Sequence, residues 1–182
     1  SGGGPGAMEA IHLGAWLAGR PQSDVDEALQ ILSAAPCFKD AGWFDTAYRV
    51  TMLFPQRKQY KSLAIPTWFY GHEPPTIFAT TIAKYFDNSI REDVILTEAY
   101  GGLIFMPGSA GTLQEVFQEA VQNHYETLGF ASPMVFVGSH FWSEEVPVYP
   151  FFQHMIACGR YQHLIISLVD DTPSIVRAIV HS

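Results

Sequence analysis

The residues best suited to chemistry lie in one short segment that ends at Glu115. An apolar run typical of a buried strand, residues 102–106, leads into a glycine-containing loop, and an amphipathic helix is predicted to begin at Thr112. The first amides of such a helix lack backbone partners, and the helix dipole adds roughly half a positive charge. We therefore predict an anion site suited to a phosphate. Its residues are Gly108, Ser109, Ala110, Gly111 and Thr112.

Glu115 is open to two interpretations. Thr112 and Glu115 have the spacing of a capping box, in which both side chains only satisfy backbone amides. Alternatively the carboxylate is functional, because a negative charge beside a phosphate site is electrostatically unfavourable unless it has a role. The helical pattern predicts an apolar face made of Leu113, Val116, Phe117, Ala120 and Val121. It predicts that Thr112, Glu115 and Glu119 lie on the opposite side.

A second glycine-rich turn, Gly2 to Gly6, opens the chain. With Ala7 it formally fits the dinucleotide pattern G-x-G-x-x-A, which is weak by itself, and Pro5 within it is unusual. We interpret it as a second loop facing the first across the crevice at the carboxyl ends of parallel strands; a flexible end is the alternative. Because such a turn normally follows a strand, we expect at least one strand upstream of Ser1 to be missing from the sequence.

Arg91 lies in a short polar segment shortly before the strand that leads to the phosphate loop. A guanidinium can bind a phosphate or a pair of sugar hydroxyls with two parallel hydrogen bonds. The simpler alternative is a surface arginine paired with Glu92 or Asp87. His72 and Glu73, in a turn after a predicted strand, could line the same crevice or merely cap a loop.

The elements that must position these residues alternate along the chain. Short apolar strands are predicted at residues 102–106, 133–138 and 163–169, with a further candidate at 62–69. Helices are predicted at residues 7–16, 23–35, 77–99 with a break near Asn88, from 112, at 148–157, and from 172. Residues 36–60 are predicted to form a loop with a short helix. This alternation predicts an α/β fold, a Rossmann-like parallel sheet with helices on both faces.

Composition limits the classes of function. With 182 residues and 48% hydrophobic content, we expect one domain over residues 1–182. A net charge of −8 argues against nucleic acid or an anionic membrane surface as partner, because both require a basic patch. No apolar run is long enough to span a bilayer. We expect a cytoplasmic protein in which Cys37 and Cys158 are reduced and buried, a disulfide being the alternative. The histidine spacing predicts no metal site.

Three segments together resemble the LOG ("Lonely Guy") family of phosphoribohydrolases, Rossmann-type nucleotide-binding proteins often mislabelled as lysine decarboxylases. Residues 2–9 resemble the family's GGGxxGxM loop, residues 89–92 its arginine-containing helix, and residues 107–115 its PGGxGTxxE motif. The resemblance covers about residues 1 to 140. Ser109 replaces the second glycine of PGG, and Glu92 stands where plant-type members carry lysine. These departures indicate a divergent branch.

The resemblance implies hydrolysis of the N-glycosidic bond of a nucleoside 5′-monophosphate, which releases the base and ribose 5-phosphate, with no metal or organic cofactor. It implies that Glu115 and Arg91 are the catalytic pair. It assigns nucleotide binding to both loops, that is to Gly3, Gly4, Gly6, Met8 and residues 108–112. It also implies a homodimer or higher homo-oligomer. The alternatives are a non-catalytic nucleotide-binding or sensing protein of the same fold, which Ser109 and the missing lysine favour, and a dinucleotide-dependent enzyme.

Overall fold

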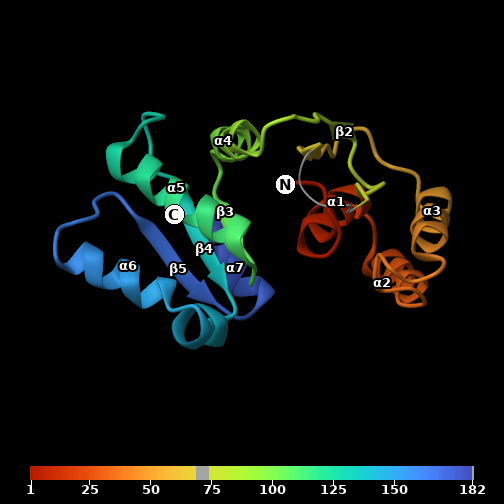
Figure 1. Cartoon of the computed structure of the whole chain (residues 1–182). Coiled ribbons are helices and arrows are strands. Elements are labelled where there is room, and N and C mark those ends of the chain that lie inside the picture. Colours follow the sequence, from red (N-terminus) through yellow and green to blue (C-terminus); the bar gives the residue numbers. More distant parts are fainter. Residues whose placement is uncertain (69–73, 182) are drawn as a thin grey trace. The chain divides into compact units, whose positions relative to one another are not determined.

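A computed structural model describes residues 1–68 and 74–181 (Figure 1). The chain divides into two compact units, residues 1–91 and 92–182. The single domain expected over residues 1–182 stays a prediction. His72 and Glu73 lie outside the described residues. Within the described ranges, no helix combines the length and apolar character needed to cross a membrane.

Three helices form most of the first unit: α1 (Ala7–Leu17), α2 (Gln22–Leu32) and α3 (Trp43–Leu53). The sequence predicted α1 and α2, and the expected short helix within residues 36–60 is α3, with 11 residues. The three helices bury one shared apolar core. Its residues are Leu13, Leu17, Ala28, Ala47, Val50, Phe54 and Phe78.

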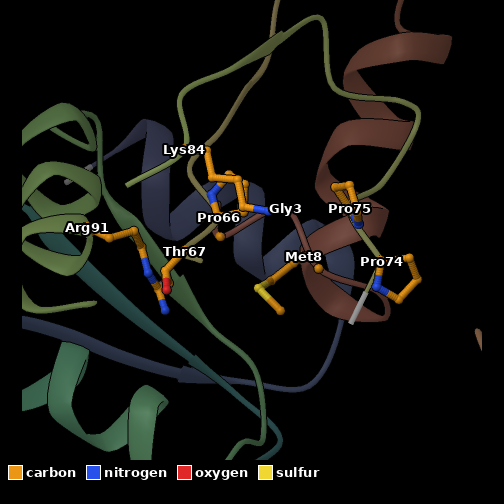
Figure 2. Close-up of a pocket in the computed structure, with 10 residues that line it drawn as sticks. Gly3, Met8, Pro66, Thr67, Pro74, Pro75, Lys84 and Arg91 are labelled. Carbon is orange, nitrogen blue, oxygen red and sulfur yellow. The ribbon is translucent and has the colours of Figure 1, made fainter. Parts of the chain in front are cut away.

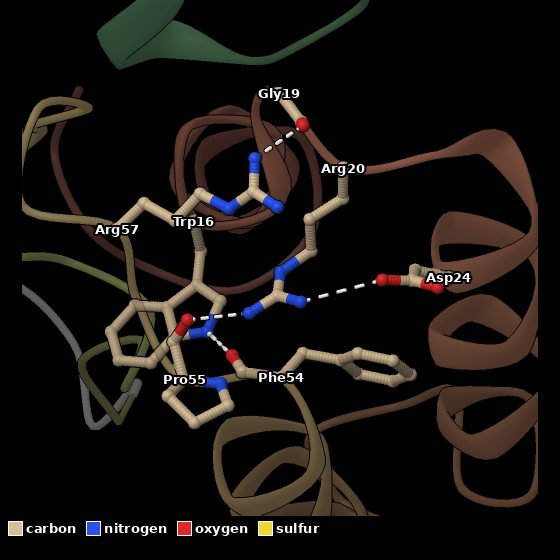
Figure 3. Close-up of polar contacts among 7 residues, drawn as sticks. All are labelled: Trp16, Gly19, Arg20, Asp24, Phe54, Pro55 and Arg57. Carbon is tan, nitrogen blue, oxygen red and sulfur yellow. Dashed lines mark hydrogen bonds and ion pairs between the residues drawn. The ribbon is translucent and has the colours of Figure 1, made fainter.

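Polar contacts fix the end of α1 against the neighbouring segments (Figure 3). Arg20 donates to Asp24 of α2 at 3.3 Å and to the Pro55 carbonyl at 2.6 Å. Trp16 Nε1 donates to the Phe54 carbonyl at 2.7 Å, and Arg57 donates to the Gly19 carbonyl. Because these bonds connect α1 to α2 and to the end of α3, the helix that follows the glycine turn is held firmly in place.

The strands of the first unit, β1 (Leu63–Ala64) and β2 (Thr81–Ile82), pair in parallel. The helix predicted from residue 77 is therefore wrong over its first half, since α4 (Asn88–Glu98) begins only at residue 88. The β-branched residues Thr81 and Ile82 favour extended backbone, and pairing with β1 satisfies their amides. Thr81 N–H donates to the Ser62 carbonyl at 3.1 Å, for example.

The second unit is a three-stranded parallel sheet in the order β3 (Leu103–Phe105), β4 (Pro133–Val137), β5 (Ile165–Val169). The connecting helices are α5 (Ala110–Tyr125) and α6 (Val148–Ala157), the latter preceded by a short π-helical segment, η1 (Phe141–Glu145); α7 (Thr172–Val180) follows β5. Helices α5 and α6 cover the face that carries Met134 and Phe136, and α7 packs on the other face (Figure 1). The predicted α/β fold with parallel strands is confirmed.

Helix α5 differs from its prediction in start and orientation. It begins at Ala110 rather than Thr112, since Leu113 N–H already donates to the Ser109 carbonyl at 3.1 Å. Its buried residues are Val116, Glu119, Ala120 and Asn123, whereas Phe117 and Val121 of the predicted apolar face are exposed. Glu119, predicted to face outward, is only 2% exposed. The helix is turned this way because the Asn123 side chain exchanges two hydrogen bonds with the backbone of Ser132, just before β4.

The two cysteines also differ from expectation. Cys37 and Cys158 are free thiols, and both are exposed rather than buried. Cys37 lies in a turn closed by a bond from its N–H to Asp40 Oδ2 at 2.8 Å, and Cys158 follows the last residue of α6. Both positions are chain turns at the surface, which the residue type alone does not reveal.

The buried Glu119 predicts a pH-dependent stability. Burial raises the pKa of this carboxyl from 4.5 to about 7, against the lowering effect of a hydrogen bond with Ser132. Between these values the unfolded chain loses the proton while the folded chain keeps it, so the stability falls as the pH rises from 4.5 to 7. We expect Glu119→Gln to raise the free energy of unfolding at pH 7.5 by up to about 3 kcal/mol, with little effect at pH 4.5.

Urea unfolding of the full chain at the two pH values measures this difference. Glu98→Gln, which replaces an exposed glutamate of α4, is the matched control and should change neither value. An equal effect of Glu119→Gln at both pH values would contradict the assignment.

Candidate functional site

The first unit contains a cavity of about 250 Å³ beside the glycine turn (Figure 2). Gly2, Gly3, Gly4 and Met8 line it from the start of the chain, Thr67 and Lys84 from the segments after β1 and β2, and Arg91 from α4. The structure thus brings together Gly3, Gly4, Met8 and Arg91, which the sequence predicted as site residues. Gly6, also predicted, does not line this cavity.

Close packing explains why glycine occupies positions 2 and 3. Gly3 has φ 76°, and a Cβ there would lie 2.6 Å from Cβ of Ala64 in β1. A Cβ on Gly2 would lie 2.8 Å from the Met8 sulfur and 3.3 Å from a guanidinium nitrogen of Arg91. The missing side chains let the turn lie directly on β1 and let Arg91 approach the backbone.

Backbone hydrogen bonds hold the turn in this position. Ile65 N–H donates to the Ser1 carbonyl at 2.9 Å, and Thr76 N–H donates to the Gly3 carbonyl at 2.8 Å. Beneath the turn the fully buried His12 ring contacts Ser1 Oγ at 2.9 Å. Burial lowers the pKa of His12 to about 4, so this ring is neutral at physiological pH and adds no charge to the site.

Two cations give the cavity its electrostatic character. Arg91 donates from Nε and Nη2 to Asn88 Oδ1, at 3.2 and 2.7 Å, and this contact orients its guanidinium. Lys84 places Nζ 3.8 Å from the ring centre of Trp68. Because the whole chain carries a charge of −8, two cations at one small cavity create a local positive potential against the overall field. The arrangement suits an anion.

The second predicted loop, in the other unit, has a different character. Residues 108–111 are exposed, and Thr112 is half-buried. A Cβ on Gly108 would lie 2.1 Å from Oγ1 of Thr112, so the Thr112 hydroxyl folds back against the loop. Ser109 is the N-cap residue and makes no side-chain cap bond. Thr112 is therefore not the N-cap, and the capping-box interpretation of Thr112 and Glu115 is wrong. Glu115 lies half-buried in the second turn of α5.

A buried carboxylate faces the start of α5. Glu92 is fully buried, and its Oε1 lies 3.9 Å from the position that a Cβ of Gly111 would occupy. Negative charge at a helix N-terminus is favourable because of the helix dipole, and here the protein's own side chain supplies it. A phosphate bound at this loop would be repelled by the nearby carboxylate of Glu92. The glycine turn with Arg91 and Lys84 is therefore the better phosphate site of the two.

Lys84 and Thr67 were missed by the sequence analysis. Lys84 was assigned to a helix, and only the parallel pairing of β1 with β2 brings it to the cavity. The extended pairing continues as a bridge between Thr67 and Tyr85. The β-branched residues at 80–82 were the one local signal that could have indicated this strand.

Comparison of the chain with models of known protein families and with curated proteins finds no match. The similarity to the LOG family thus rests on the three motifs themselves.

The geometry of the turn predicts that two alanine substitutions lower the free energy of unfolding by different amounts. Gly3 and Gly6 have nearly the same φ, 76° and 77°, but only at Gly3 would a Cβ meet another atom within 4 Å. We expect Gly6→Ala to lower the free energy of unfolding by about 1 kcal/mol through backbone strain alone. Gly3→Ala should cost about 2–4 kcal/mol, since the clash with Ala64 adds to the strain. Urea unfolding of both variants measures the difference, and equal losses would contradict this packing.

Proposed function

We propose that the protein binds a nucleoside 5′-monophosphate and hydrolyses its N-glycosidic bond, releasing the base and ribose 5-phosphate. The observation that carries the proposal is the cavity at which the glycine turn, Lys84 and Arg91 converge in an otherwise acidic chain. The order of the three motifs in the sequence supports the same activity.

The phosphate is assigned to the glycine turn of the first unit. Gly2, Gly3 and Gly4 line the cavity, so an oxyanion there would meet backbone rather than side chains on this side. Arg91 presents a planar guanidinium already oriented by Asn88, and Lys84 adds a mobile point charge. Charge-assisted hydrogen bonds of this kind contribute about 1.5–3 kcal/mol each. Binding energy from the phosphate, remote from the reacting bond, positions the sugar for reaction.

The chemical step is assigned to Glu115 by the resemblance. Cleavage of the bond between ribose C1′ and the base nitrogen develops positive charge on the sugar, as in other glycoside hydrolyses. A carboxylate stabilises that charge or accepts a proton from the attacking water. The water hydroxyl then bonds to C1′, and its proton leaves with the base. The start of α5 supports this assignment, because Glu115 does not occupy the N3 position of a capping box.

The proposal extends to assembly and location. The resemblance favours a homodimer or higher homo-oligomer acting on a small-molecule nucleotide, and the cysteine usage favours a cytoplasmic location. Light scattering on the purified chain measures the oligomeric state directly.

Substitution of the two assigned residues tests the proposal. We expect the wild type to release free base from at least one member of a panel of nucleoside monophosphates. Glu115→Gln should lower kcat roughly 10²–10³-fold, because it removes a charge opposed to the transition state. Its Kd for the nucleotide should hold or improve, because a negative charge is gone. Arg91→Gln should instead raise the Kd.

Chromatography of the released base gives kcat, and calorimetry gives Kd at one fixed salt concentration. Glu98→Gln is the control for loss of an exposed glutamate and should behave as wild type. If no nucleotide of the panel releases its base, the proposed hydrolase activity is refuted. Tight nucleotide binding without turnover, unchanged in Glu115→Gln, would identify a nucleotide-binding or sensing protein.

A further inference from the structure

Two exposed aromatic side chains, Trp68 and Phe86, stack on each other at the surface of the first unit. Their ring centres are 6.1 Å apart at an interplanar angle of 21°, and the residues are 57% and 64% exposed. Backbone bonds fix the two segments that carry them: Trp68 N–H donates to the Tyr85 carbonyl at 2.9 Å, and Tyr85 N–H donates to the Pro66 carbonyl at 3.0 Å. We call this pair the aromatic ledge.

The aromatic ledge adjoins the phosphate cavity. Lys84 lines the cavity, and the same side chain places Nζ 3.8 Å from the ring centre of Trp68. Thr67, directly before Trp68, also lines the cavity. A cationic cavity with exposed aromatic rings at its edge presents the two surfaces that a nucleotide requires, one for the phosphate and one for a flat ring.

We propose that the aromatic ledge is the base-binding part of the site, on which the heteroaromatic ring of a nucleoside monophosphate stacks. This inference rests on the proposed phosphate site. Stacking of a base on an aromatic side chain strengthens binding roughly 5- to 150-fold. Because every base has a π-face, stacking selects for a flat ring and discriminates little between purines and pyrimidines. The substrate class is therefore a nucleoside 5′-monophosphate with broad tolerance for the base.

Lys84 connects phosphate binding to base binding. In the structure its ammonium group lies over Trp68, a contact weaker than a charge-assisted hydrogen bond. A phosphate in the cavity draws the ammonium away from the ring, since Lys84 already lines that cavity. This movement of the Lys84 ammonium group uncovers a face of the Trp68 ring, on which the base can stack. Binding of the phosphate end thus prepares the aromatic ledge.

Trp68→Leu tests this inference, with adenosine 5′-monophosphate and ribose 5-phosphate as ligands for the full chain. The variant should raise the Kd for the nucleotide at least 5-fold and should leave unchanged or lower the Kd for ribose 5-phosphate, because Lys84 no longer has a ring to leave. Phe44→Leu is the matched control, because Phe44 is 55% exposed and stacks on Tyr48 of α3 but does not line the cavity. It should change neither constant.

Tryptophan fluorescence gives an independent readout. Trp68 is the most exposed of the four tryptophans, so stacking should quench its emission as the nucleotide saturates. The quenching should persist in Phe44→Leu and disappear in Trp68→Leu. Trp68→Phe should retain most of the affinity for the nucleotide, because it keeps an aromatic ring. If Trp68→Leu loses affinity and Trp68→Phe does not, the loss comes from the missing ring and not from a disturbed fold.

Three outcomes decide between the two proposals. An unchanged nucleotide affinity in Trp68→Leu overturns the aromatic ledge and leaves the phosphate site intact. Equal losses of nucleotide and ribose 5-phosphate binding in Trp68→Leu also overturn it, because the effect is then not specific to the base. If wild-type protein binds nucleotide but not ribose 5-phosphate, the phosphate site fails, and the Trp68 quenching then reports base binding by itself.

Discussion

The close approach of the glycine turn to β1 is the constraint on which the candidate site depends. Gly3 adopts a backbone conformation that L-residues with a side chain rarely reach, and its Cα faces Ala64 with no room for another carbon. Because the turn lies directly on the strand, the same packing brings the segments after β1 and β2 to the cavity, with Thr67 and Lys84. Arg91 approaches the turn over Gly2, which also lacks room for a side chain. Glycines at positions 2 and 3 allow the turn to pack against β1 and Arg91, and Arg91 and Lys84 line the cavity beside the turn.

The two glycine loops predicted from the sequence differ in the charged side chains that lie near them. The first has Arg91 and Lys84 beside it, and the neutral His12 beneath it adds no charge. The second begins a helix whose N-terminal turn is faced by the buried carboxylate of Glu92. An oxyanion is favoured at the first loop and disfavoured at the second, although both have the glycine content of a phosphate site. The first unit therefore contains the glycine loop better suited to an anion.

The sequence predicted most of the second unit because its strands are short apolar runs bounded by turns, and α6 and α7 begin where the pattern indicates. It failed where tertiary pairing overrides local preference. Residues 81–82 form a strand only because β1 offers them a partner, and α5 buries Glu119 because Asn123 binds the backbone of Ser132. Gly3, Gly4, Met8 and Arg91 could be assigned from their motifs. Lys84 could not, since a two-residue strand pairing brings it to the cavity and the β-branched residues at 80–82 were the only local signal for that strand.

The central claim is that the glycine turn and Arg91 together bind the phosphate of the ligand. Titration of ¹⁵N-labelled protein with ribose 5-phosphate, followed by ¹H–¹⁵N correlation spectra, tests it most directly. We expect the amide signals of Gly3 and Gly4 and the Nε–H signal of Arg91 to shift along one saturation curve, with smaller changes at Gly108 to Gly111. Saturable shifts confined to residues 108–112, with the glycine turn unaffected, would contradict it.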